Sequence, residues 1–78
     1  MTLRVMTRAE AQKLLMQHAY EDSYARVGAG IGLHRRPKKP YRHNQVRAWA
    51  LGEKTPAEHA RRAIEAWSNG YIPATVWR

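Results

Sequence analysis

The sequence contains no cysteine, only six acidic residues and no long apolar run. The absence of cysteine excludes disulfides, thiolate nucleophiles and thiolate metal ligands together. No stretch approaches the roughly 20 apolar residues that cross a bilayer. The apolar part of residues 1–6 is too short for the core of a signal peptide. We therefore expect a cytoplasmic protein with no membrane partner.

The chain is 78 residues long and shows no internal repeat or low-complexity tract. A chain this short buries only about 60% of the surface that it exposes when unfolded, so its own core is small. We expect a single domain spanning residues 1–78, and homodimer formation would relieve the shortage of core.

Acidic residues are missing altogether from positions 23–52. That stretch holds seven of the 14 lysines and arginines in a chain whose net charge is +8. The seven are Arg26, Arg35, Arg36, Lys38, Lys39, Arg42 and Arg47. A segregated basic zone attracts polyanions, whereas evenly spread charge mainly keeps a protein in solution. Nucleic acid is therefore the expected partner, ahead of an anionic membrane.

Two helices are predicted in the first part of the chain. Thr7 and Glu10 have the spacing of a capping box, so the first helix should begin at Thr7 and end near Asp22. Its expected core face consists of Ala11, Leu14, Leu15, His18 and Ala19. A second, short helix is expected over residues 23–29, because the glycines that follow weaken a helix.

Two further helices are predicted in the second part. The third should begin near Asn44, a good N-cap residue, and end at Gly52, since glycine often closes a helix. The fourth should open with Thr55 as its cap, Pro56 in the first turn and Glu58 as the reciprocating acid. Its expected buried stripe is Ala60, Ala63, Ile64 and Trp67, with Arg61, Arg62 and Glu65 outside and Gly70 as terminator. The predicted fold is all-α, with four to five short helices and an extended C-terminal tail over residues 71–78.

Residues 33–42 combine two prolines with a run of cations. Proline blocks helix and central strand alike, and the like charges repel, so we expect an extended, mobile basic loop. The loop lies directly before the third helix, where its cations could hold phosphates. The candidate phosphate-binding residues are Arg35, Arg36, Lys38, Lys39, Tyr41 and Arg42.

The third helix has an inward apolar stripe of Val46, Trp49 and Ala50, and Ala48 is expected to face outward with the polar residues. In the major groove, side-chain amides pair with adenine and arginine pairs with guanine. The candidate base-reading residues are His43, Asn44, Gln45 and Arg47. Double-stranded DNA is the expected partner, because single-stranded RNA recognition generally uses an exposed aromatic platform that this sequence does not suggest.

The spacing Val46-x-x-Trp49-x-x-Gly52, followed by Pro56 and then by Ala63 and Ile64, resembles the phage Cro-like helix-turn-helix repressors. The resemblance covers roughly the last 40 residues. It implies a helix-turn-helix domain with its recognition helix at 43–51, in which the tryptophan packs beneath that helix. One departure is clear: the two helices of such a motif are joined by about 3–4 residues, whereas here the basic loop 33–42 is inserted before the recognition helix.

The apolar side chains of the tail are Tyr71, Ile72, Val76 and Trp77. Two interpretations stay open for them, closure of the core or contact between two copies of the chain. The resemblance implies a homodimer on a pseudo-palindromic site, with half-sites about 34–36 Å apart. Assembly of that dimer only on DNA is an alternative.

The expected function is that of a sequence-specific transcriptional regulator, a phage or prophage repressor acting on DNA in the cytoplasm of a bacterial host. One alternative is an excisionase or architectural factor that bends DNA. Another is a protein-interaction module, such as an antitoxin or a polymerase-binding inhibitor, with the basic block facing an acidic partner.

Catalysis, cofactors and metal binding find no support in the sequence. The four histidines, His18, His34, His43 and His59, share no three- or four-residue spacing. The glycines at 28, 30 and 32 lack the final Gly-Lys-Ser/Thr of a phosphate loop and follow no predicted strand. No nucleophile, base and orienting acid can be matched by spacing. We expect no enzyme activity and no small-molecule substrate.

Overall fold

The computed structural model describes residues 6–77, which fold into four α-helices and one short 3-10 helix. They are α1 (Arg8–Asp22), α2 (Tyr24–Gly32), α3 (His43–Ala50), α4 (Glu58–Trp67) and η1 (Ala74–Trp77). These residues contain no strand, so the all-α prediction is confirmed. None of the helices described is both long and apolar enough to span a bilayer. Residues 1–5 of the N-terminal stretch and Arg78 of the predicted tail lie outside the described residues.

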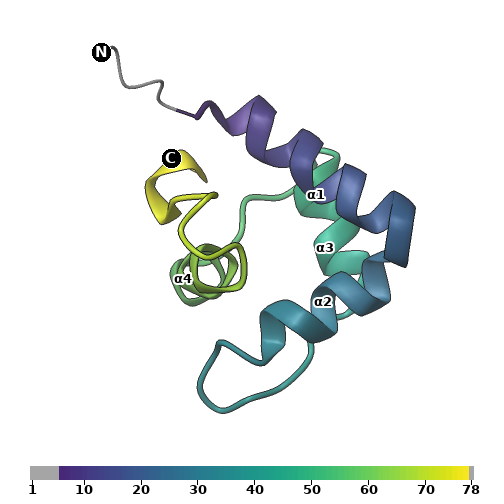
Figure 1. The fold of residues 1–78 in the computed structure, drawn as a ribbon, viewed down its shortest axis with the longest axis vertical. Coiled ribbons are helices and arrows are strands. Elements are labelled where there is room, and N and C mark those ends of the chain that lie inside the picture. Colours follow the sequence, from purple (N-terminus) through teal and green to yellow (C-terminus); the bar gives the residue numbers. More distant parts are fainter. Residues whose placement is uncertain (1–5, 78) are drawn as a thin grey trace.

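The helices enclose a single core. Helices α1, α2 and α3 pack on one another, and α4 closes the assembly against α2 and η1 (Figure 1). The loop between α2 and α3 extends away from this bundle in the same view. Each helix contributes one of the largest side chains that are completely buried, namely Leu15, Ile31, Val46, Ile64 and Trp77. The segments before and after α4 add Pro56 and Ile72.

Helix α1 begins where the sequence predicts. The Thr7 hydroxyl accepts a hydrogen bond from the Glu10 backbone N–H at 3.2 Å, and the Glu10 carboxylate accepts one from the Thr7 N–H at 3.4 Å. Ala11 and Leu15 are completely buried, as expected. The prediction is wrong for His18, which is exposed and meets the Trp67 ring edge-on with ring centroids 4.9 Å apart.

Helix α2 runs through its glycines to Gly32 and is longer than predicted. The reason is a close approach of the backbone at residues 39–41. The Tyr41 N–H donates to the Gly28 carbonyl at 3.1 Å, and the Lys39 N–H donates to the Gly32 carbonyl at 3.3 Å. A Cβ at Gly32 would lie 2.6 Å from the Pro40 Cα, so only glycine permits this packing.

Helix α3 begins at His43, the first residue of the predicted recognition helix 43–51, but its N-cap is Arg42 and not Asn44. The Gln45 side-chain oxygen accepts a hydrogen bond from the Arg42 N–H at 3.0 Å and so satisfies that end of the helix. The predicted apolar stripe is buried, and Gly52, at φ +77°, ends the helix as expected. Ala48, expected to face outward, is 8% exposed and thus also buried.

Helix α4 begins at Glu58, and the predicted Thr55 cap is wrong. The Thr55 hydroxyl instead accepts a hydrogen bond from the Arg8 guanidinium at 2.7 Å. Pro56 is buried ahead of the helix, where its carbonyl accepts from the Arg61 Nε at 2.8 Å. The buried stripe is as predicted except that Trp67 is half-buried, and Gly70 at φ +83° follows the helix.

The predicted extended tail ends in the short 3-10 helix η1. Ile72, Val76 and Trp77 are buried in the core of their own chain, which is the core-closure interpretation. Burial leaves these three side chains little surface for contact with a second copy of the chain. Tyr71 remains 69% exposed. The turn into η1 is held by the Glu65 carboxylate, which accepts from the Ala74 N–H at 2.9 Å.

Candidate nucleic-acid interface

The first turns of α3 present a polar face without any acidic side chain. His43, Asn44 and Arg47 are exposed, and their spacing of three and four residues places them on one side of the helix. On the opposite side Val46, completely buried, and Trp49 fix the helix to the core. Three of the four predicted base-reading residues therefore lie together on a braced surface helix.

Gln45 has a different role in this structure. It is exposed, but its side-chain oxygen is already engaged by the Arg42 N–H. Bidentate pairing with adenine needs both the oxygen and the nitrogen of the amide, so Gln45 would have to release the helix cap to read a base in that way. Sequence reasoning missed this role, although Arg42 and Gln45 have the N-cap to N3 spacing of a cap.

The cations of the loop fall into two groups. Arg36, Lys38, Lys39 and Arg42 are exposed, as a phosphate contact requires. Arg35 is half-buried, with its guanidinium carbon 4.5 Å from the centre of the Tyr41 ring. Arg35 is therefore partly covered by its contact with the protein and is less available to a phosphate than the four exposed cations.

Among the candidate phosphate ligands, Tyr41 differs most from the prediction, because it is buried and not exposed. It is 3% exposed, and its ring packs edge-on against Trp49 at 5.1 Å and parallel to His59 at 6.1 Å. Burial raises the pKa of Tyr41 above its ordinary value, and the positive charge of Arg35 partly offsets that rise. The ring is thus a neutral core group, because an aromatic side chain gains more from packing than from a phosphate contact in water.

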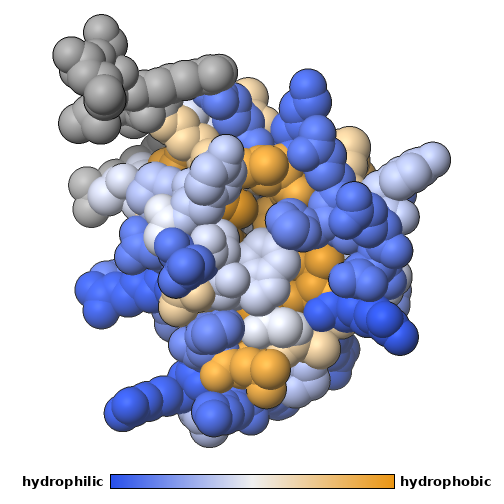
Figure 2. Space-filling view, viewed as in Figure 1, coloured by the Kyte–Doolittle hydropathy of each residue, from blue (hydrophilic) through white to orange (hydrophobic). Residues whose placement is uncertain are grey.

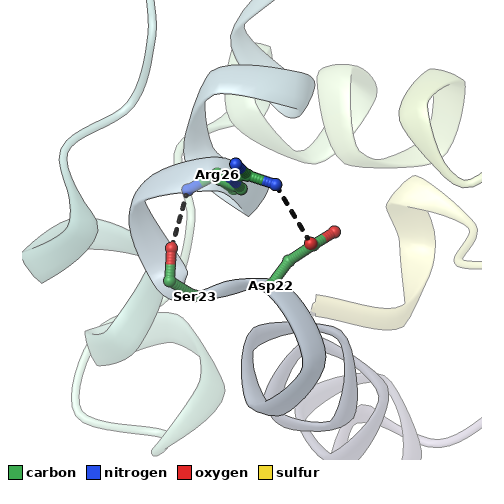
Figure 3. Close-up of polar contacts among 3 residues, drawn as sticks. All are labelled: Asp22, Ser23 and Arg26. Carbon is green, nitrogen blue, oxygen red and sulfur yellow. Dashed lines mark hydrogen bonds and ion pairs between the residues drawn. The ribbon is translucent and has the colours of Figure 1, made fainter.

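Arg26, the first cation of the basic stretch, forms contacts with Asp22 and Ser23 at the junction between α1 and α2 (Figure 3). Its guanidinium lies 3.6 Å from the Asp22 carboxylate, and its backbone N–H donates to the Ser23 hydroxyl at 3.3 Å. Both groups of the ion pair are well exposed, so the pair adds little to stability. It does offset one positive charge at the start of the basic stretch.

A hollow of about 300 Å³ lies between α3 and the start of α4. Its polar lining includes Asn44, Gln45, Lys54, Thr55 and His59. The turn that carries Lys54 is held by the Glu53 and Lys54 N–H groups, which donate to the Ala48 carbonyl at 2.9 and 3.3 Å. Lys54 therefore adds an exposed cation beside the predicted base-reading face. Because Lys54 follows directly after the Gly52 turn that ends the predicted recognition helix, its place beside that helix could have been predicted from the sequence.

A second surface of the molecule is different in character. Figure 2 shows hydrophobic surface gathered between α1 and α4. A groove of about 420 Å³ there has no lysine or arginine in its lining, which includes Leu14, Trp67, Tyr71 and Ile72. A polyanion would find no counter-charge in this groove, so the basic loop and α3 are the candidate nucleic-acid interface.

Residues 6–77 contain no group of three histidine, aspartate or glutamate side chains that could hold a metal ion. Comparisons of the chain with protein-family models, with curated proteins and with solved structures found no match.

Proposed function

We propose that this protein binds duplex DNA sequence-specifically through α3 and the basic loop before it, and that it regulates transcription as a Cro-like helix-turn-helix repressor. The observation that carries the proposal is the exposed trio His43, Asn44 and Arg47 on the first turns of a core-braced helix. That trio adjoins a loop with several exposed cations and no acid.

In this proposal the N-terminal half of α3 enters the major groove. Arg47 pairs with guanine and Asn44 with adenine, while His43 contacts a neighbouring base edge. Arg36, Lys38, Lys39 and Arg42 hold phosphates and set the position of the helix on the duplex. Lys54, beside the hollow next to α3, joins this set. Affinity comes mainly from counterions released when these cations neutralise phosphates.

The mechanism is occupancy of an operator. A recognition helix of eight residues reads few base pairs, so two copies on adjoining half-sites would supply the specificity of a repressor. The bound protein would keep polymerase from its promoter in the cytoplasm of the bacterial host. No catalytic step and no cofactor enter the proposal.

The test is selection from a randomised duplex pool at two salt concentrations, followed by sequencing. An enriched, palindromic motif is the expected result. Binding that is sensitive to salt but blind to sequence would favour a DNA-bending architectural factor. Absence of any binding would refute the proposal and favour a protein-interaction module.

The base-reading role is tested with Arg47→Ala, and Lys13→Ala serves as its matched control because it removes one exposed cation from α1. Arg47→Ala should reduce the discrimination between the selected site and random DNA by about 1–3 kcal/mol. Lys13→Ala should leave that discrimination unchanged. Equal weakening of Arg47→Ala on both DNAs would show that Arg47 does not read a base.

A further inference from the structure

The basic loop is tied to the end of the helix from which it leaves. The Gly32 carbonyl accepts hydrogen bonds from the Arg35 N–H at 3.4 Å and from the Lys39 N–H at 3.3 Å. One turn earlier in α2, the Gly28 carbonyl accepts from the Tyr41 N–H at 3.1 Å. The chain therefore departs from α2 and returns to the same helix, closing residues 33–40 into a loop with a fixed base.

The two glycines make this closure possible. A Cβ on Gly28 would lie 3.1 Å from the Tyr41 carbonyl carbon, and one on Gly32 would lie 2.8 Å from the Lys39 carbonyl carbon. Both neighbours are backbone atoms, which cannot rotate away as the end of a side chain can. The returning segment lies against bare helix backbone as a result.

Arg35 and Tyr41 close the loop a second time through their side chains. The Arg35 guanidinium lies over the Tyr41 ring at 4.5 Å, a cation–π contact. The Arg35 Nε is inaccessible to solvent and has no hydrogen-bond partner, so the contact with the ring is what holds this charge inward. The ring itself is fixed by Trp49 of α3 and His59 of α4.

The remaining cations of the loop, Arg36, Lys38 and Lys39, are exposed. A flexible loop would lose conformational entropy when it bound DNA, and that loss would lower the affinity. A loop closed by backbone hydrogen bonds and by an anchored ring has met much of that cost during folding. Its cations are then held in one arrangement before any ligand arrives.

We propose that Arg35 and Tyr41 are positioning residues that hold the basic loop in a preformed shape, so that Arg36, Lys38 and Lys39 meet duplex phosphates next to the bases facing α3. This inference rests on the proposed DNA binding. Arg35 itself contacts no phosphate and acts through the loop. The sequence suggested the opposite role for both residues, a direct phosphate contact.

The experiment compares Arg35→Ala with Arg36→Ala, because each removes one positive charge from the same loop. Affinity for a random duplex is measured across a salt series, and amide hydrogen exchange is measured for residues 35–41. Arg36→Ala should lower the salt slope by about one unit and leave the exchange rates unchanged. Arg35→Ala should weaken binding several-fold more than Arg36→Ala and speed exchange at the Lys39 and Tyr41 amides.

Substitutions of the ring supply the second measurement. Tyr41→Phe keeps the ring under Arg35 and should match the wild type in affinity and in exchange. Tyr41→Leu should also weaken binding and speed exchange at the Lys39 and Tyr41 amides, although it removes no charge. The double variant Arg35→Ala with Tyr41→Leu should bind no worse than the weaker single variant, because the Arg35–Tyr41 contact is absent from all three. Thermal unfolding of each variant shows whether it is folded at the assay temperature, and Arg35→Gln replaces Arg35→Ala if the latter is not.

The two proposals fail in different ways. If the wild-type chain binds no duplex, DNA binding is refuted and the positioning role falls with it. If the wild type binds but Arg35→Ala behaves like Arg36→Ala in affinity and exchange, the positioning role alone is overturned.

Discussion

Gly32→Ala is the sharpest perturbation of the packing between α2 and the returning segment of the loop. The added methyl carbon would lie 2.6 Å from the Pro40 Cα and 2.8 Å from the Lys39 carbonyl carbon. Real Cβ contacts do not approach so closely, and both neighbours belong to the backbone. Helix and loop must therefore separate, which also strains the hydrogen bond from the Lys39 N–H to the Gly32 carbonyl.

The expected cost follows from three opposing contributions. Overpacking of a well-packed site costs about 1–3 kcal/mol, and loss of one backbone hydrogen bond costs about 1 kcal/mol more. Replacing glycine by alanine returns at most about 1 kcal/mol in a helix interior, and less at Gly32 because it is the last residue of α2. The net destabilisation should be about 1–4 kcal/mol, and each kcal/mol should lower the melting temperature by roughly 4–8 °C in a domain of this size.

Gly30→Ala is the matched control in the same helix. Its Cβ would lie 2.9 Å from the Trp67 Nε1, an atom of a half-buried side chain and not of the backbone. The gain in helix propensity is at least as large inside α2 as at its last residue, so Gly30→Ala should cost less stability than Gly32→Ala. Urea unfolding followed by circular dichroism measures both variants. Equal stability of Gly32→Ala and Gly30→Ala would refute the close approach of the loop to α2.

Two further predictions concern single groups. Burial raises the pKa of Tyr41 above its ordinary value of 10.0, so its contribution to stability is complete below about pH 10 and is lost as the pH rises further. In an alkaline unfolding titration Tyr41→Phe should therefore lose less stability above pH 10 than the wild type. The control Tyr20→Phe changes a side chain that is 94% exposed and should unfold like the wild type. Identical alkaline curves for the wild type and both variants would contradict the burial of Tyr41. Thr7→Ala removes the cap of α1 and should lower the free energy of unfolding in urea by about 0.5–2 kcal/mol. The control Thr75→Ala, at an exposed position, should lower it less. An unchanged urea midpoint for Thr7→Ala would show that the cap does not stabilise the fold.

The sequence by itself determined the features that depend on residues within a turn or two of each other. The Thr7–Glu10 cap, the buried Val46 and Trp49 stripe of α3 and the turn at Gly52 were all predictable, because each is decided by local hydrogen bonding, helical periodicity or backbone conformation. The exposed polar trio of α3 follows from the same periodicity.

Only the tertiary structure decided the features whose partners lie far along the chain. Glycines that should weaken α2 extend it, because residues 39–41 return to pack on them. Tyr41 is buried because Trp49 and His59 surround it, and Thr55 leaves the cap of α4 to accept a hydrogen bond from Arg8, 47 residues away. In each case a local preference, worth about 1 kcal/mol for helix propensity or a cap, gives way to a contact with a partner that only the fold brings close.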